Sequence, residues 1–302
     1  MLMLIPVIIP AIVSSIPVIL DTDIGGDIDD TWALAMMLKS PELDIKLIVT
    51  DTGNTTYRAK VVAKMLEVAG RTDIPVGIGL HLSDEEQGQA DWVKDYDLDS
   101  YPGKVHKDGV GALIDTIMDS DKPVTLICIG PVPNISNALE REPKIAQKAK
   151  FVGMHGSIRK GYNGSEKISA EYNVVAYPKD CQKAFTAEWD MTITPVDTCG
   201  LVVLKGEKYK KVCESQDPIA KAVIENYNIW AKGKPEQSSV LFDTVAIYLA
   251  FSEELLVMEK LGIRVTDDGF TAEDDTAKVM NCAMDWKDLS AFEDFLVERL
   301  IK

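Results

Sequence analysis

Five aspartates gather within ten residues near the start of the chain. They are Asp21, Asp23, Asp27, Asp29 and Asp30. They directly follow a short apolar run at 18–20, which predicts a buried strand. So much like charge in one loop is unfavourable without a cation, and carboxylate oxygens are the usual protein ligands of Ca²⁺ and Mg²⁺. The segment therefore predicts a divalent metal site. In the alternative interpretation an aspartate only caps the next helix, which explains one of the five.

Polar side chains recur beyond later apolar runs. They are Asn54, Asn163, Glu171, Asn173 and Asp243. An acid inside an apolar run, as at Asp243, is costly unless it is paired or binds a metal, although a helix N-cap would also explain it. Each asparagine alone is an ordinary turn residue. Ligands of parallel α/β sheets bind beyond the carboxyl ends of the strands, so we expect these side chains to meet there.

Short β-branched runs alternate with longer amphipathic segments from residue 18 onward. The runs that predict strands lie at 18–20, 45–49, 74–78, 124–129, 151–154 and 192–196, with a further strand-like segment near Ile263. The segments that predict helices lie at 31–39, 57–68, 111–118, 134–139, 216–232, 240–251 and 289–301. Residues 82–108 show no period and predict a surface loop. The alternation predicts an α/β fold, a single large domain over 18–302 with a mostly parallel central sheet flanked by helices.

Composition and charge limit the partners of the chain. Of its 302 residues 48 are acidic and 32 basic, and a formal net charge of −16 opposes binding to nucleic acid or to an anionic membrane. Five scattered cysteines predict neither a disulfide framework nor a zinc site. Residues 1–17 form an apolar leader that lacks the basic start and the cleavage site of a secretory signal. The leader is too short to span a membrane and is interrupted by Pro6 and Pro10. We expect a cytoplasmic protein, with export through a truncated signal as the alternative.

Several short motifs occur in a familiar order. They are Asp-Thr-Asp at 21–23 with Asp-Asp at 29–30, Thr-Gly-Asn at 52–54, Leu-Ile-Cys-Ile-Gly-Pro-Val-Pro-Asn-Ile at 126–135, Met-His-Gly at 154–156, Ala-Glu-Tyr-Asn at 170–173 and Phe-Asp-Thr-Val at 242–245. Over nearly its whole length the chain resembles the inosine-uridine nucleoside hydrolases. The resemblance implies a Ca²⁺-dependent hydrolase, with Mg²⁺ as the alternative ion, that cleaves the N-glycosidic bond of a nucleoside or related N-riboside. It also implies a role in purine and pyrimidine salvage and a homo-oligomer, either a dimer or a tetramer.

The resemblance also implies roles for single residues. The Ca²⁺ ligands would be the carboxylates of Asp23, Asp30 and Asp243 and the main-chain carbonyl of Ile129, and Asp23 would also be the base that activates the attacking water. The residues that would contact the ribose are Asp29, Asn54, Asn163, Glu171, Asn173 and, along the sugar face, Met154. The acidic loop is two residues longer than the short family form. Asp27 could therefore replace Asp29 as the metal ligand or the sugar contact.

The leaving-group end of the predicted site departs from the family pattern. Phe242 stands where many members have the histidine that protonates a purine base. His81, just after the third predicted strand, is our first substitute acid, although a solvent-facing loop histidine explains it equally well. Tyr227 and Trp230 are candidates for stacking on the base.

Two other functions fit part of the pattern. Asp-Thr-Asp after an apolar strand also resembles haloacid dehalogenase-type phosphatases, but those enzymes keep their second acidic pair far downstream, whereas here Asp29 and Asp30 follow at once. Loss of leaving-group activation at Phe242 would instead suit a metal-stabilised sugar-binding protein or a hydrolase of another N-glycoside or sugar conjugate. The carboxylates and amides for a ribose-like pocket remain in either case.

Overall fold

A central sheet of ten strands forms the middle of the protein. The computed structural model describes residues 15–84 and 87–302, so most of the predicted leader lies outside the described residues. The first strand begins at Ile16, two residues before the predicted start of the domain. The strands are β1 (Ile16–Thr22), β2 (Leu43–Thr50), β3 (Val76–Ile78), β4 (Val105–His106), β5 (Val124–Cys128), β6 (Ala149–Met154), β7 (Met191–Thr194), β8 (Leu256–Val265), β9 (Thr271–Glu273) and β10 (Val279–Trp286).

The sheet is parallel except at one edge. Its strand order is β4-β3-β2-β1-β5-β6-β7-β10-β8-β9, and only the pairings of β8 with β10 and with β9 are antiparallel. From β1 the chain proceeds to β2 on one side and later returns to β5 on the other, where Asp21 lies beside Val49 and Cys128. Such a reversal opens a crevice at the carboxyl ends of the strands, which is the usual ligand site of these sheets.

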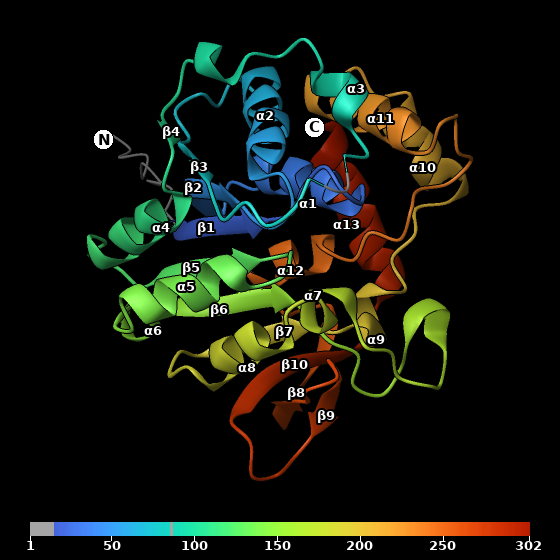
Figure 1. The fold of residues 1–302 in the computed structure, drawn as a ribbon. Coiled ribbons are helices and arrows are strands. Elements are labelled where there is room, and N and C mark those ends of the chain that lie inside the picture. Colours follow the sequence, from blue (N-terminus) through green and yellow to red (C-terminus); the bar gives the residue numbers. More distant parts are fainter. Residues whose placement is uncertain (1–14, 85–86) are drawn as a thin grey trace, which may run out of the picture.

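Helices cover both faces of the sheet (Figure 1). The helices are α1 (Asp29–Leu38), α2 (Thr55–Val68), α3 (Ala90–Val93), α4 (Gly109–Met118), α5 (Pro133–Arg141), α6 (Ile145–Lys148), α7 (Tyr172–Val175), α8 (Pro178–Thr186), α9 (Val196–Cys199), α10 (Gly206–Cys213), α11 (Pro218–Trp230), α12 (Thr244–Leu249) and α13 (Leu289–Ile301), with short 3₁₀ turns η1 (Leu98–Ser100) and η2 (Tyr162–Gly164). Because side chains alternate along a strand, Val18 and Leu20 enter the core beneath α1, α2 and α11 to α13, while Ile19 enters the core beneath α4, α5, α6 and α8. The predicted α/β fold with a mostly parallel sheet is confirmed.

Several elements differ from the prediction. Helices α8 and α10 and strand β10 were not predicted, because each helix buries only two or three side chains and β10 carries polar residues such as Asn281 and Asp285. The predicted loop at 82–108 contains α3, η1 and β4. The helix predicted at 240–251 is only α12, since the residues before Thr244 form part of a cavity wall. These are places where tertiary contacts outweigh a short local pattern.

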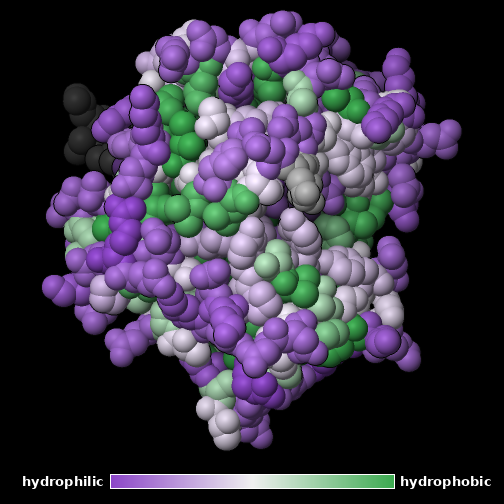
Figure 2. All heavy atoms as spheres, in the orientation of Figure 1, coloured by the Kyte–Doolittle hydropathy of each residue, from purple (hydrophilic) through white to green (hydrophobic). Residues whose placement is uncertain are grey.

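The surface view (Figure 2) shows how hydrophilic and hydrophobic residues are distributed on one face of the molecule. Figure 2 shows hydrophilic residues over most of the rim of this face, with hydrophobic residues in separate groups between them. None of the helices in the described part of the chain is both long and apolar enough to cross a lipid bilayer.

Candidate active site

A cavity of about 430 Å³ opens at the carboxyl ends of the central strands. Loops after β1, β5 and β6 contribute to its wall, together with the first turn of α1, the start of α7, the end of α11 and the start of α12. It is lined by Asp23, Gly26, Asp27, Asp29, Asp30, Gly88, Ile129, Met154, Tyr162, Glu171, Tyr172, Asn173, Trp230, Phe242 and Asp243. Its position matches the crevice expected where the strand order reverses.

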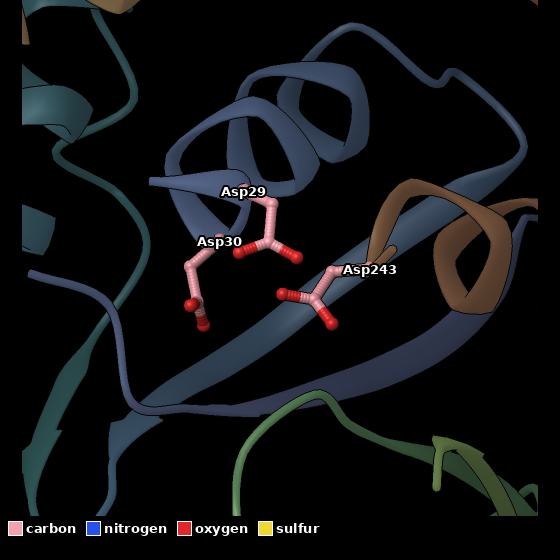
Figure 3. A group of neighbouring side chains, drawn as sticks. All are labelled: Asp29, Asp30 and Asp243. Atoms are coloured by element: carbon pink, nitrogen blue, oxygen red, sulfur yellow. The ribbon is translucent and has the colours of Figure 1, made fainter. Parts of the chain in front are cut away.

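Three carboxylates from two helices converge in this cavity. Asp29 and Asp30 lie in the first turn of α1, and Asp243 directly precedes α12; one carboxylate oxygen from each lies within 4.8 Å of the others (Figure 3). Asp243 occupies the N-cap position of α12, but its side chain makes no capping hydrogen bond. The capping alternative therefore does not explain this acid, and we refer to the three residues as the acidic trio.

Burial makes the negative charge of the acidic trio unfavourable. Each member is at most 5% exposed, and burial raises the pKa of all three carboxyl groups well above their usual range, with repulsion from neighbouring aspartates adding to the shift. Two groups oppose this shift at Asp30: the Thr22 hydroxyl, which donates to it at 2.5 Å, and the charge of Arg58. Buried oxygen donors without enough compensating positive charge fit a hard divalent cation such as Ca²⁺.

Asp23 lies beside the acidic trio, and its charge raises the pKa of all three members. It follows β1 directly and is 8% exposed. A Cβ atom at Gly130 would lie 2.8 Å from one Asp23 carboxylate oxygen and 2.9 Å from its backbone nitrogen, so only glycine fits the turn after β5. Asp23 and Ile129, the residue before Gly130, line the same cavity as Asp30 and Asp243. The four residues predicted as metal ligands from these positions thus lie together.

Asn173 and Glu171 join the cavity wall to the ends of β5 and β6. The Asn173 amide donates to the carbonyl oxygens of Ile129 at 3.1 Å and of Met154 at 3.0 Å. The Glu171 carboxylate caps α7 by accepting from the backbone N–H of Asn173 at 2.8 Å, and it accepts from that of Gly156 at 2.9 Å. Burial raises the pKa of Glu171 to about 7 despite these hydrogen bonds. The pocket thus presents fixed amide and carboxylate groups, which suit recognition of sugar hydroxyls.

Aromatic side chains form the remaining wall. The rings of Phe242 and Tyr162 meet edge to face with centroids 5.9 Å apart, and Trp230 stacks on Tyr227 at 6.0 Å. Tyr172 is 46% exposed at the mouth. Tyr227 itself lies in the core, where its hydroxyl donates to the Gln237 carbonyl at 3.0 Å. Trp230 is therefore the predicted stacking residue that lines the cavity, and Tyr227 supports it from behind.

Besides Tyr227, three predicted residues lie away from the cavity lining. Asn54 caps α2 by accepting from the backbone N–H of Tyr57 at 3.0 Å. His81 has a half-exposed side chain 3.3 Å from the Asp84 carboxylate. Asn163 is exposed, with a positive φ of 58° within η2. The solvent-facing interpretation of His81 fits this placement, and the ribose contacts of Asn54 and Asn163 stay predictions. Asp27 lines the cavity but is exposed and lies outside the acidic trio.

Side chains that the sequence did not single out hold the acidic loop in place. The buried Arg58 guanidinium donates to the carbonyls of Ile24 and Thr52, each at 3.0 Å. The Gln89 amide donates to the Asp27 carbonyl at 3.3 Å. The sequence signal for Arg58 is an arginine in the first turn of a predicted helix that follows a polar loop. Gln89 lies in a segment without hydrophobic periodicity, so the sequence offered no comparable signal for it.

Two further buried acids support the site without lining it. Asp21 in β1 accepts a hydrogen bond from the Asn134 amide at 2.9 Å, and burial raises the pKa of Asp21 to about 7. Burial also raises the pKa of Asp51 well above its usual range, and neither of its carboxylate oxygens has a hydrogen-bond partner of good geometry among residues 15–84 and 87–302. The five aspartates of this segment thus occupy two kinds of position: Asp21 lies in the sheet, and the other four line the cavity.

Relatives and solved structures can now be compared with this geometry. The model of the family described as inosine-uridine preferring nucleoside hydrolase matches residues 18–292. A probable uridine nucleosidase 2 from Arabidopsis thaliana is 28% identical over 270 residues, covering 84% of this chain and 83% of the relative. A pyrimidine-specific ribonucleoside hydrolase from Enterobacter sp. (strain 638) is 28% identical over 226 residues, covering 70% of this chain and 69% of the relative.

Solved structures share the fold. A plant nucleoside hydrolase has a TM-score of 0.78 at 24% identity, covering 94% of this chain and 98% of that chain. A purine-preferring ribonucleoside hydrolase from Gardnerella vaginalis has a TM-score of 0.75 at 22% identity, with the same coverage. These likenesses agree with the family match along the sequence. The chain belongs to the inosine-uridine preferring nucleoside hydrolase family, whose members hydrolyse the N-glycosidic bond of nucleosides.

Proposed function

We propose that this enzyme is a Ca²⁺-dependent ribonucleoside hydrolase whose reaction takes place in the cavity above β1 and β5. The single observation that carries the calcium dependence is the acidic trio, three buried carboxylates within 4.8 Å of one another. Asp30 and Asp243 would hold the ion together with Asp23 and the carbonyl of Ile129. The place of Asp29 within the trio favours it over the exposed Asp27 as the additional ligand or ribose contact.

The chemical roles of the residues follow from the charge that develops at the sugar. A bound divalent cation lowers the pKa of water and orients sugar hydroxyls. Asp23 accepts the proton of the attacking water, a role that typically adds on the order of 10²–10⁴ in rate. As the base departs, positive charge builds at C1′, and the buried carboxylates stabilise it electrostatically. Glu171 and Asn173, fixed by backbone hydrogen bonds, orient the ribose.

The family match also decides between the earlier alternatives. It excludes the phosphatase hypothesis, because the matching model covers residues 18–292 and describes nucleoside hydrolases. It supports an enzyme over a sugar-binding protein without activity. Relatives are named for uridine, pyrimidine and purine ribonucleosides, so the substrate panel should include all three classes. We further propose that it acts in nucleoside salvage in the cytoplasm. We also propose that it is a homo-oligomer, and gel filtration with light scattering would test this oligomeric state.

The deciding experiment is a panel of ribonucleosides and other N-ribosides assayed with Ca²⁺, in which ribose and free base are both measured. Equal release of the two products from at least one substrate is expected for N-glycosidic hydrolysis. Release of neither product from any riboside by a protein shown to have bound Ca²⁺ would overturn the proposal. A matched assay of p-nitrophenyl phosphate serves as the negative control.

A further inference from the structure

We propose that the preferred substrate is a riboside whose base carries a fixed positive charge on its ring, such as a pyridinium riboside or an N7-alkylated purine riboside. This inference rests on the proposed function, since it names the substrate class of the same site. It combines four observations: the charge of the cavity lining, the aromatic wall, an adjoining second cavity with an acidic residue at the border, and a described lining without histidine or lysine.

The cavity lining carries negative charge and aromatic rings. Among the described residues that line it, six are acidic and none is lysine, arginine or histidine. Four of the acids are the acidic trio and Asp23, which a bound cation would partly neutralise. Glu171 is buried with a pKa of about 7, so the exposed Asp27 is the main carboxylate outside that group. A cationic base therefore enters a favourable potential, whereas an anionic base would be repelled.

The wall beside Asp27 is aromatic. Phe242, Tyr162, Tyr172 and Trp230 all line the cavity. The faces of such rings attract cations, and the attraction is greatest for tryptophan and when water is excluded. An aromatic wall next to a carboxylate is a general solution for binding an organic cation.

A second cavity of about 440 Å³ adjoins the first. Asp27, Trp230 and Phe242 line both cavities, so these three residues form the border. Its other lining residues are apolar or uncharged, for example Val203 and Val240. A ring held at the border thus has its positive charge beside Asp27 and room for a substituent beyond it.

The described lining also lacks a histidine or lysine that could protonate a neutral base. No described lining residue offers an imidazole or ammonium group, and each oxygen of Glu171 already accepts a backbone N–H. A cationic base needs no proton. When the C1′–N bond breaks, its electron pair stays on the ring nitrogen and cancels the ring charge. The water oxygen bonds to C1′, and one water proton passes to Asp23 and then to solvent. The products are ribose, the neutral base and one proton.

The test separates binding of charge from chemical lability. In the Ca²⁺-loaded enzyme, 1-methylnicotinamide, a cation, and neutral nicotinamide are compared as competitive inhibitors of p-nitrophenyl riboside hydrolysis. We expect the cation to bind about tenfold more tightly. Nicotinamide riboside should also be cleaved with a kcat/KM on the order of 100-fold above that of uridine, because only uridine lacks an activated leaving group.

Variants locate the source of the preference. Asp27→Asn should reduce the cation-to-neutral affinity ratio at least about threefold, whereas Glu236→Gln, which removes a charge from a neighbouring exposed position outside both linings, should leave the ratio unchanged. Calorimetry with Ca²⁺ alone checks that Asp27→Asn still binds the ion; loss of that binding would make Asp27 a ligand and overturn its assigned role. Trp230→Leu is the second variant, and it should lower the ratio through the ring alone.

The outcomes distinguish this inference from the function on which it rests. Hydrolysis of p-nitrophenyl riboside with equal affinity for the cation and the neutral inhibitor would overturn the inference and leave the ribonucleoside hydrolase assignment intact. Failure to cleave any riboside, with Ca²⁺ bound, would overturn both. Preferred binding of the cation together with faster cleavage of nicotinamide riboside supports the inference.

Discussion

Removing Ca²⁺ should destabilise the protein, because the acidic trio exists as a binding site only in the folded state. With oxygens no more than 4.8 Å apart, each pair of unit charges costs at least about 3.5 kcal/mol at an effective dielectric constant of about 20. The ion-free trio therefore retains protons, and a cation that displaces them stabilises the fold by mass action. At 100 times Kd this linkage is worth about 2.7 kcal/mol. For 302 residues the unfolding entropy is about 0.6 kcal/mol/K, so Tm should rise by about 4 °C.

Thermal melts in EDTA and in excess Ca²⁺ measure this shift, with matched variants beside the wild type. Asp243→Asn should lose the Ca²⁺-induced shift. It should melt above the wild type in EDTA, because the buried carboxyl group, whose raised pKa favours the unfolded state at neutral pH, is gone. Asp95→Asn, at an exposed position, should keep the shift. An unchanged wild-type Tm at saturating Ca²⁺, or an undiminished shift in Asp243→Asn, would refute the argument that the acidic trio holds the ion.

Three further predictions concern the base, the protons and the leaving group. Asp23→Asn should lower kcat on the order of 10²-fold or more while Ki for ribose changes less; equal losses in both would make Asp23 mainly a ligand. Because burial raises the pKa of Asp21 and of Glu171 from near 4 when unfolded to about 7, the folded state binds more protons between these values. The Tm in EDTA should therefore fall as pH rises from about 4 to about 7, and a Tm that rises over this range would contradict the assignment. Phe242→His should increase kcat/KM for inosine relative to p-nitrophenyl riboside, which the wild type should cleave much faster than inosine. His81→Ala should leave inosine turnover unchanged, since His81 pairs with Asp84 outside the cavity lining; loss of turnover would identify it as the missing acid.

The sequence predicted the site residues best where they follow the ends of strands, because the sheet then determines where their side chains lie. Asp23, Asp30 and Ile129 follow or lie near the ends of β1 and β5, and a parallel sheet brings these ends together. Asp243 was detectable as an acid in an apolar run, where burial without a partner is costly. Two members of the acidic trio, Asp30 and Asp243, could therefore be anticipated from local pattern and topology, whereas Asp29 was expected to contact the ribose.

The rest of the site depended on loop conformation, which local pattern does not determine. Tyr162, which the sequence did not single out, packs edge to face on Phe242 in the cavity wall, whereas the neighbouring Asn163 is exposed and has a positive φ. Gln89 contacts the acidic loop from a segment without any period. Such contacts join residues far apart in the chain, so a single sequence offers no spacing from which to infer them.

Release of ribose from p-nitrophenyl riboside is the measurement that tests the central claim most directly. It is followed in parallel with p-nitrophenol, in excess Ca²⁺ and again after removal of the ion with EDTA, for the wild type and for Asp23→Asn. The account predicts equimolar ribose and p-nitrophenol from the wild type with Ca²⁺, with turnover lost in EDTA, restored when Ca²⁺ is returned, and lost in the variant. Undiminished turnover in EDTA by protein shown to be free of metal, or in Asp23→Asn, would contradict it.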